Sequence, residues 1–319
     1  MKRVGTYDIA KALLILLVIL GHVLQYANPG YAILQYALVQ NWISSFHMPA
    51  FFLLSGYLFN EEKWKKASFM AFVRKRLYTL MIPYICFETI GLVYKALVLH
   101  SQTIGEGFVK MITLQCNVGA DWFLPAMFLA QIVFLLVIKT VSRNYLWVFI
   151  IPCMCAAWVF PTGALWRVLC RSVLALGFLL TGLVLQKHVK PRENSLKRNA
   201  ALLSFLLTSM LSLVIFKYAS IDFYFCQIDH PLLFFLAGVS GFMMVLSAVT
   251  WLGKNCFLSW LGKNTLVIMG THQLVLYTVP ASSSMVWVVG IFGSIIMLEC
   301  IIVYLSERYA PILVGRIRE

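Results

Sequence analysis

Residues 8–27 read Asp-Ile-Ala-Lys-Ala-Leu-Leu-Ile-Leu-Leu-Val-Ile-Leu-Gly-His-Val-Leu-Gln-Tyr-Ala. About 20 residues of α-helix are needed to cross the hydrocarbon core of a bilayer. This stretch has that length and is apolar except for a few side chains, Asp8, Lys11 and His22 among them. It is too long for the apolar part of a secretory signal peptide, and no small-residue cleavage site follows it. The stretch therefore predicts a first membrane-spanning helix.

The composition extends this prediction to the whole chain. Of its 319 residues 61% are hydrophobic and 12% are charged, and the mean hydropathy is +0.85. Soluble domains have about 45–50% apolar and about 25% charged residues, which excludes a soluble enzyme, a disordered protein and a disulfide-knit secreted domain. We expect an all-α integral membrane protein with one domain over residues 1–319. Its helices, about ten in number, are expected at 8–27, 44–60, 77–99, 122–139, 144–160, 164–186, 200–218, 231–251, 257–278 and 285–305.

The distribution of charge predicts the orientation. With the N-terminus inside, 21 of the 26 Lys and Arg residues fall on the inner side. Such a bias is typical of cytoplasmic loops, so we expect both termini inside and a location in the cytoplasmic (inner) membrane. The same bias explains the net charge of +14 without a nucleic-acid partner. The eight Cys are scattered without the spacing of a metal site, so no metal is expected.

Titratable side chains inside the expected spans are costly in lipid unless they pair or form a site. They are Asp8, Lys11, His22, His47, Glu88, Arg167, Arg171, His272 and Glu299. Counted along their helices, the three histidines lie at one depth in the outer half of the membrane, level with Asp121. This coincidence predicts a buried polar site, although a single such His is as often a packing residue. For the two glutamates we expect only pairing with buried partners.

The first span places two polar side chains on one face. Lys11 and His22 are 11 residues apart, close to three helical turns and about 16 Å along the axis. A cation near the inner mouth and a deep imidazole would suit an elongated ligand. Alternatively, Lys11 reaches the inner headgroups and is neutralised by Asp8, three residues before it.

A basic stretch precedes the third span. Arg74, Lys75 and Arg76 form a run of three cations. Such a run can hold a nucleotide phosphate or act only as a topology anchor.

Taken together, these residues resemble the membrane acyltransferase 3 family, and its fucose 4-O-acetylase-like members in particular. The similar segments follow one another in the expected order from residue 3 to about 305. They are Lys11-x10-His22, residues 46–59 (Phe-His-Met-Pro-Ala-Phe-Phe-Leu-Leu-Ser-Gly-Tyr-Leu-Phe), Phe72-Val-Arg-Lys-Arg-Leu77 with Ile82-Pro-Tyr84, Asp121-Trp-Phe-Leu124, and Leu261-Gly-Lys-Asn-Thr265 with His272. Two positions depart from the pattern, since Lys11 stands where Arg is commoner and Thr265 where Ser is usual. Lys keeps the charge but lacks the bidentate fork of Arg.

The resemblance implies ten helices and transfer of an acyl group, usually acetyl, from cytoplasmic acetyl-CoA to a sugar hydroxyl on the extracytoplasmic side. A sugar hydroxyl is a poor nucleophile, so a His must take its proton or carry the acyl group itself. His22 is expected in this catalytic role, with Lys11 positioning the donor and Asp8 orienting Lys11. The anionic CoA would be held by Lys11, Arg74, Lys75 and Arg76.

The acceptor, a glycan or lipid-linked sugar, is expected near the polar groups of the outer half. The substrate-binding candidates are His47, Asp121, Trp122, Arg167, Arg171 and His272. Trp122 fits either stacking on a sugar or anchoring at the membrane interface. The two arginines fit either an anionic acceptor or snorkelling to the interface. Ser55 and Gly56 are expected to allow close helix packing.

A secondary transporter is the rival class, because it too would place His, Asp and Arg inside the membrane. Inverted repeats would favour it, and none is visible in the sequence. Transfer or hydrolysis of acetyl-CoA by the purified protein would separate the two classes.

Overall fold

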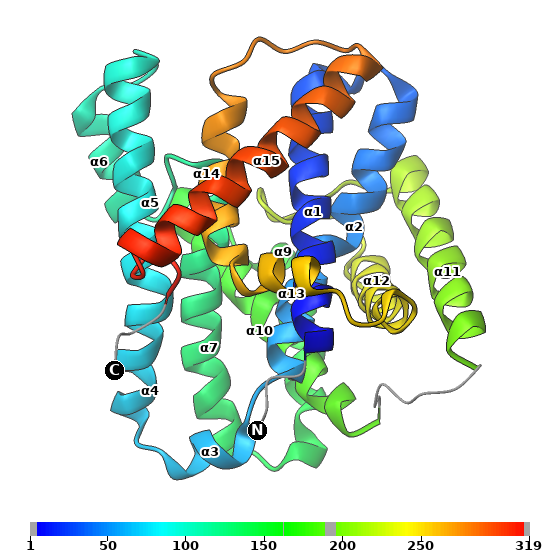
Figure 1. Cartoon of the computed structure of the whole chain (residues 1–319). Helices are drawn as coiled ribbons and strands as arrows, with labels where there is room; N and C mark the ends of the chain where they lie inside the picture. Colours follow the sequence, from blue (N-terminus) through cyan, green and yellow to red (C-terminus); the bar gives the residue numbers. More distant parts are fainter. Residues whose placement is uncertain (1–4, 162, 189–195, 316–319) are drawn as a thin grey trace.

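The computed structural model describes residues 5–161, 163–188 and 196–315. Almost all of this part of the chain is helical (Figure 1). The helices are α1 (Gly5–Ala27), α2 (Leu34–Tyr57), α3 (Glu61–Lys66), α4 (Phe69–Arg76), α5 (Ile82–Val93), α6 (Ile104–Ile112), α7 (Phe123–Thr140), α8 (Trp147–Met154), α9 (Ala156–Val159), α10 (Ala164–His188), α11 (Leu196–Tyr218), α12 (Pro231–Leu252), α13 (Cys256–Lys263), α14 (Thr265–Leu276) and α15 (Met285–Tyr309).

Short segments join them. The 3₁₀ turns are η1 (Pro29–Tyr31), η4 (Gly119–Trp122) and η5 (Arg143–Tyr145), and the π-helical turns are η2 (Leu77–Met81) and η3 (Tyr94–Val98). Through η2 and η3 the helices α4 and α5 become one continuous helix over Phe69–Val98. The strands β1 (Ile221–Asp222) and β2 (Gln227–Ile228) form a small antiparallel hairpin.

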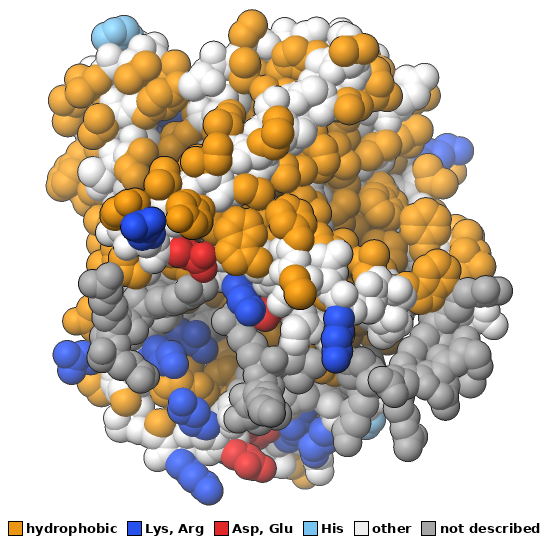
Figure 2. Space-filling view, in the orientation of Figure 1, with side chains coloured by type: hydrophobic (Ala, Val, Ile, Leu, Met, Phe, Trp, Pro, Cys, Tyr) orange, Lys and Arg blue, Asp and Glu red, His pale blue; other side chains and the backbone are white. Residues whose placement is uncertain are grey.

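Within the part of the chain that the structure describes, six helices are long and apolar enough to cross a membrane: Gly5–Ala27, Phe69–Val98, Gly119–Thr140, Ala164–His188, Pro231–Leu252 and Met285–Tyr309. Large apolar side chains cover much of the surface in Figure 2, which a water-soluble monomer does not tolerate. Only 22% of the most apolar stretch of α15 is buried inside the protein, so the remainder of that stretch faces outward. The protein is therefore an all-α, multi-pass membrane protein.

Four of the expected spans differ clearly from the observed helices, and the third begins at Phe69, eight residues before its expected start. The second begins at Leu34, ten residues before the expected start, because the polar Asn41 lies within α2 instead of ending it. Residues 144–160 form no single helix but η5, α8 and α9, with a break at Cys155. The ninth span is divided between α13 and α14 at Asn264.

Glycines allow α2 and α10 to pack closely. A Cβ atom on Gly56 would overlap the backbone of Leu179, and one on Gly182 would overlap the backbone of Leu53. The packing role expected for Gly56 is thus confirmed. Because this contact fixes α2 against α10, it also fixes the position of His47 within the bundle.

Cationic side chains gather at one end of the molecule, which we call the basic end. In Figure 2 the visible Lys and Arg side chains lie mainly in its lower part, and Figure 1 shows α3 and α4 there. The first residues of α1 lie near this end, and α1 runs from it towards the loop between α14 and α15. Lys11 is therefore nearer to the basic end than His22.

Candidate functional site

His22 of α1 and His272 of α14 form a hydrogen-bonded pair. The distance between His22 Nδ1 and His272 Nε2 is 2.9 Å, and the ring centroids are 5.0 Å apart. His272 is fully buried and His22 is half-buried. Two side chains 250 residues apart in the sequence thus meet inside the bundle.

The partners of His272 define where the protons of the pair lie. His272 Nδ1 is 2.7 Å from the carbonyl oxygen of Ile268. A carbonyl oxygen only accepts, so Nδ1 of neutral His272 donates and its Nε2 carries the lone pair. His22 Nδ1 must then donate to that Nε2. This assignment, made from the hydrogen-bond network, leaves His22 Nε2 unprotonated, as a general base or nucleophile requires.

His47 of α2 approaches the same pair. Its Nδ1 is 2.7 Å from the carbonyl oxygen of Ile43, so the same reasoning puts its lone pair on Nε2. His47 lies within electrostatic reach of His22. The structure thus brings His22 and His272 into direct contact, and His47 of a third helix lies close enough to interact electrostatically with His22.

The residues flanking His272 hold α14 in place. Thr271 Oγ1 donates to the Glu299 carboxylate, 2.7 Å from Oε2. Gln273 Oε1 accepts from the backbone N–H of Ala120 at 2.8 Å. These buried bonds tie α14 to α15 and to η4 on either side of His272, so its ring has a defined orientation. The expected pairing of Glu299 with a buried partner is confirmed.

A cavity of about 630 Å³ opens at the basic end. Five cations line it, and no Asp or Glu is among the described residues of its wall. The cations are Lys11, Lys63, Lys75, Arg76 and Lys263. Its deeper wall is mainly apolar, with Ser55 and Gln131 as polar exceptions. This arrangement suits a ligand with an anionic head and a long, weakly polar arm.

The cavity extends towards the histidines. Met269 is its deepest lining residue on α14 and precedes His272 by one turn, about 4.5 Å of rise. Phe51 is its deepest lining residue on α2 and follows His47 by about one turn. His22 itself is not among the residues that line the cavity. The cavity therefore approaches the helical turns that carry His47 and His272, and the expected passage from the cations to His22 stays a prediction.

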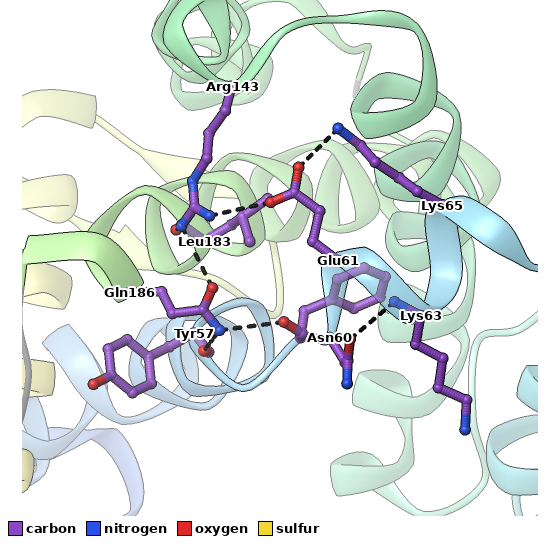
Figure 3. Close-up of polar contacts among 9 residues, drawn as sticks. Tyr57, Asn60, Glu61, Lys63, Lys65, Arg143, Leu183 and Gln186 are labelled. Atoms are coloured by element: carbon purple, nitrogen blue, oxygen red, sulfur yellow. Dashed lines mark hydrogen bonds and ion pairs between the residues drawn. The ribbon is translucent and has the colours of Figure 1, made fainter. Parts of the chain in front are cut away.

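The α3 segment forms part of the cavity rim, and ion pairs and hydrogen bonds hold it against the neighbouring segments (Figure 3). Glu61 bonds Arg143 at 3.1 Å and Lys65 at 2.8 Å. The Arg143 guanidinium also donates to the Leu183 carbonyl oxygen of α10. Asn60, which caps α3 by accepting from the backbone of Lys63, lines the cavity together with that residue. The ion-pair cluster thus fixes the segment that carries Lys63.

The Leu261–Thr265 segment shapes the other side of the rim. A Cβ atom on Gly262 would overlap the backbone of Asp8, so glycine lets α13 lie directly against α1. Asn264 is fully buried, and its side chain donates to the Trp260 carbonyl oxygen where the helix breaks. Lys263 and Thr265 on either side of Asn264 both line the cavity.

The residues expected to bind CoA are not equivalent. Lys11, Lys75 and Arg76 line the cavity. Arg74 does not line it, and its exposed side chain lies with the guanidinium 5.9 Å from the Tyr78 ring centroid. Lys11 Nζ lies 3.7 Å from Asp8 Oδ1, as the i, i+3 spacing predicts.

Asp121 and Trp122 are buried in η4. The Asp121 carboxyl neighbours that of Glu88, and the Glu88 carboxylate accepts from the backbone N–H groups of Asn117 and Val118. The expected pairing of Glu88 with buried partners is thus confirmed. The Trp122 side chain is only 6% exposed and packs among aromatic rings. The structure places it in the aromatic core and not on a surface open to a sugar.

Arg167 and Arg171 lie on the first turns of α10. They line a second cavity of about 260 Å³, together with Lys110 of α6. This cavity is separate from the one at the basic end and shares none of its lining residues.

Several residues that line the cavity were not predicted as site residues from the sequence, chiefly Lys63, Lys263, Ser55 and Gln131. Lys263 and Ser55 belong to segments that were singled out, so their position in those segments was an available signal. Lys63 follows the second span within a run of charges, which looked like a topology signal. Gln131 had no signal, because one amide in an apolar span is ordinary.

The fold and site define a class: a multi-pass membrane protein in which a cationic cavity leads towards buried histidines. A family model described as an acyltransferase domain, that of the acyltransferase 3 family, matches residues 4–306. The chain therefore belongs to the acyltransferase 3 family of membrane acyltransferases.

A curated relative is the nodulation protein NolL of Mesorhizobium japonicum (strain LMG 29417 / CECT 9101 / MAFF 303099). It is 30% identical over 151 residues, which is 45% of this chain and 38% of the relative. The aligned part thus spans well under half the length of that protein. No solved structure matches the chain.

Proposed function

We propose that this protein is an inner-membrane O-acyltransferase that moves an acetyl group from cytoplasmic acetyl-CoA to a hydroxyl of an extracytoplasmic or lipid-linked glycan. The observation that carries the proposal is the cationic cavity that ends one turn from His47 and His272, beside the His22–His272 pair. In this proposal the chain passes the membrane ten times, with the broken α8–α9 and α13–α14 segments counted as passes. Both termini and the basic end face the cytoplasm.

The cavity offers the two kinds of surface that the donor needs. CoA carries phosphates at one end, and charge-assisted bonds from Lys and Arg are strong ligands for phosphate. Arg76, whose guanidinium lies 4.8 Å from the Phe72 ring centroid, has a planar fork for bidentate contact. The pantetheine arm is long and narrow, and the apolar wall between Leu58 and Phe51 would guide its thioester towards the histidines.

His22 Nε2 would perform the proton transfer. It takes the proton of the acceptor hydroxyl as that oxygen attacks the thioester carbonyl carbon. When the tetrahedral intermediate collapses, the C–S bond breaks and the proton passes to the sulfur, which releases CoA as the thiol. The imidazolium that exists between these steps keeps its Nδ1–H bond to His272 Nε2. Buried hydrogen bonds of this kind stabilise developing charge.

The same lone pair also serves a two-step route. His22 Nε2 would attack the thioester carbonyl carbon, the C–S bond would break, and CoA would leave as the thiolate, with the acylated ring as an imidazolium that keeps its Nδ1–H bond to His272. The acceptor hydroxyl would then attack the acyl carbon and break the N–C bond, and the proton that it loses balances the thiolate, so that CoA ends as the thiol. Rapid-quench mass spectrometry with acetyl-CoA alone distinguishes the routes, since only the second leaves an acetyl group on the protein.

The test of the proposal uses the purified protein in lipid nanodiscs. We expect release of free CoA thiol from acetyl-CoA, and in cells a loss of acetyl mass from envelope glycans when the gene is deleted. His22→Ala should lower the rate at least about 100-fold, the usual contribution of general acid–base catalysis. His230→Ala, an exposed histidine outside the site, is the matched control.

Two outcomes would contradict the proposal. One is full activity of a normally expressed His22→Ala protein. The other is a wild-type protein that binds acetyl-CoA without cleaving or transferring it and instead moves a solute across liposomes, which would favour the transporter class.

A further inference from the structure

The second cavity combines three cations with aromatic walls. Lys110, Arg167 and Arg171 line it, and so do Tyr224 and Phe225 of the hairpin turn. The Arg171 guanidinium lies 4.3 Å from the Tyr224 ring centroid, and that of Arg167 lies 5.8 Å from the Phe225 ring centroid. Cation–π contacts of this kind orient the guanidinium groups without neutralising them.

None of these cations has an ion pair among the described residues. Arg171 is 4% exposed and donates through Nε to the Tyr224 carbonyl oxygen at 2.7 Å. Lys110 Nζ donates to the neutral Gln102 side chain at 2.9 Å. The nearby acid, Asp222, is engaged with the backbone N–H of Phe225 at 2.8 Å. Asp222 lies within electrostatic reach of Arg171, and Glu106 within reach of Lys110, but neither forms an ion pair with these cations among the described residues. Partly buried positive charge that no ion pair neutralises is costly, so an anion in this cavity would be stabilised.

The cavity shares no lining residue with the donor cavity and contacts the core of the protein. Along α10, Arg171 is 15 residues, about 22 Å, from Gln186, whose side chain bonds the Tyr57 carbonyl oxygen near the basic end. The Arg171 guanidinium also lies 5.3 Å from the ring centroid of Trp122 in η4. Through Ala120 the same turn bonds Gln273, the neighbour of His272. The second cavity is thus linked through η4 to the segment that carries His272.

We infer that the second cavity binds an oxyanion carried by the acceptor, either the phosphate of a lipid-linked sugar or the carboxylate of an acidic sugar. That the bound molecule is the acceptor of the reaction rests on the proposed function. That the cavity binds an anion rests only on the residues that line it. Three cations and planar guanidinium groups suit the geometry of such oxyanions.

The test measures thermal unfolding in nanodiscs of zwitterionic phosphatidylcholine. Saturating CoA is present throughout, so that the cations of the donor cavity are occupied. Inorganic pyrophosphate and glucuronate are the two probes, one for each source of the anion. A ligand that binds only the folded state raises the unfolding temperature in a saturable way.

Three single variants carry the comparison. Arg167→Gln and Lys110→Gln each remove one half-buried cation of the cavity. Lys217→Gln removes an exposed lysine outside the cavity, with the same change in net charge. Arg171 is left intact because its buried bonds also support the fold. We expect the shift caused by at least one probe to disappear in the first two variants and to persist in the third.

The inference would be overturned if neither probe raised the unfolding temperature, or if the shift survived unchanged in Arg167→Gln and Lys110→Gln. Stabilisation by CoA and release of CoA thiol from acetyl-CoA are measured on separate aliquots of the same preparations, to which no CoA has been added beforehand. A protein that binds the probe at this cavity but does not cleave acetyl-CoA would contradict the proposed function while leaving the anion site intact. The opposite result would contradict the anion site alone.

Discussion

At the scale of single residues, the orientation of one imidazole decides the chemistry. His272 Nδ1 donates to the Ile268 carbonyl oxygen, so its Nε2 is free to accept from His22 Nδ1. His22 therefore has its lone pair on Nε2, the atom that would react. This is the role that a carboxylate has in a catalytic triad, here taken by a neutral ring. His272 is therefore a positioning residue in the proposed mechanism.

His272→Ala should lower kcat by roughly 100-fold or more, because His22 loses the partner that holds its tautomer and stabilises its charged form. The KM for acetyl-CoA should change little, since His272 does not line the donor cavity. Steady-state CoA release measures both constants. A variant with unchanged kcat and a raised KM would assign His272 to donor binding instead.

The basic stretch provides a second residue-scale test, with its own control. Arg76→Gln should raise the KM for acetyl-CoA by about 10-fold or more, the usual effect of losing a hydrogen bond to a charged group. Arg74→Gln removes the same charge two residues away, but on an exposed side chain outside the cavity. Its effect should be small. A larger effect for Arg74→Gln would refute the placement of the CoA phosphates in this cavity.

At the scale of elements, the contact of α13 with α1 positions both ends of the donor site. Gly262 lies against the backbone of Asp8, on the helix that carries Lys11 and His22. The next residue, Lys263, is exposed to the cavity. Close helix contact through a small residue is the usual way in which membrane helices pack.

Gly262→Ala should lower the free energy of unfolding by about 1–3 kcal/mol, the typical effect of overpacking, because the added methyl group forces α13 away from α1. Thermal unfolding in nanodiscs measures the change. Gly290→Ala on the outward-facing α15 is the control, as a Cβ atom there meets nothing within 4 Å. Equal unfolding temperatures for the two variants would contradict the close contact.

At the scale of the whole molecule, the cavity at the basic end and the cavity lined by Arg167 and Arg171 share no residue and differ in their walls. The larger is cationic at its mouth and apolar within, and the smaller has cations and aromatic rings. A protein with its donor on one side of a membrane and its acceptor on the other requires such a division. The orientation of the basic end is thus central to the proposed function.

A green fluorescent protein fused after residue 319 should fluoresce in intact cells, because both termini are proposed to lie in the cytoplasm, where this reporter folds. Alkaline phosphatase fused after His100 should be active, because residue 100 is proposed to lie outside. The positive-inside bias is the physical reason for both expectations. The reverse pattern of reporter activity would invert the proposed direction of transfer.

Sequence by itself determined the class of the protein and the types of group at its site. Runs of about 20 apolar residues have few stable arrangements other than membrane helices, and intramembrane histidines and cations are costly without a use. The periodicity of a helix also placed Lys11 and His22 on one face of α1. These properties depend on residues close together in the chain.

Only the tertiary structure decided which of those groups meet. The His22–His272 bond spans 250 residues, and the separation of Arg74 from Arg76 depends on how α4 lies against its neighbours. The breaks at Cys155 and Asn264, and the burial of Trp122 among aromatic rings, follow from packing that no local pattern encodes. Contacts between distant helices are set by the shape of the whole bundle, because each helix can rotate or shift until its small residues and polar groups find partners.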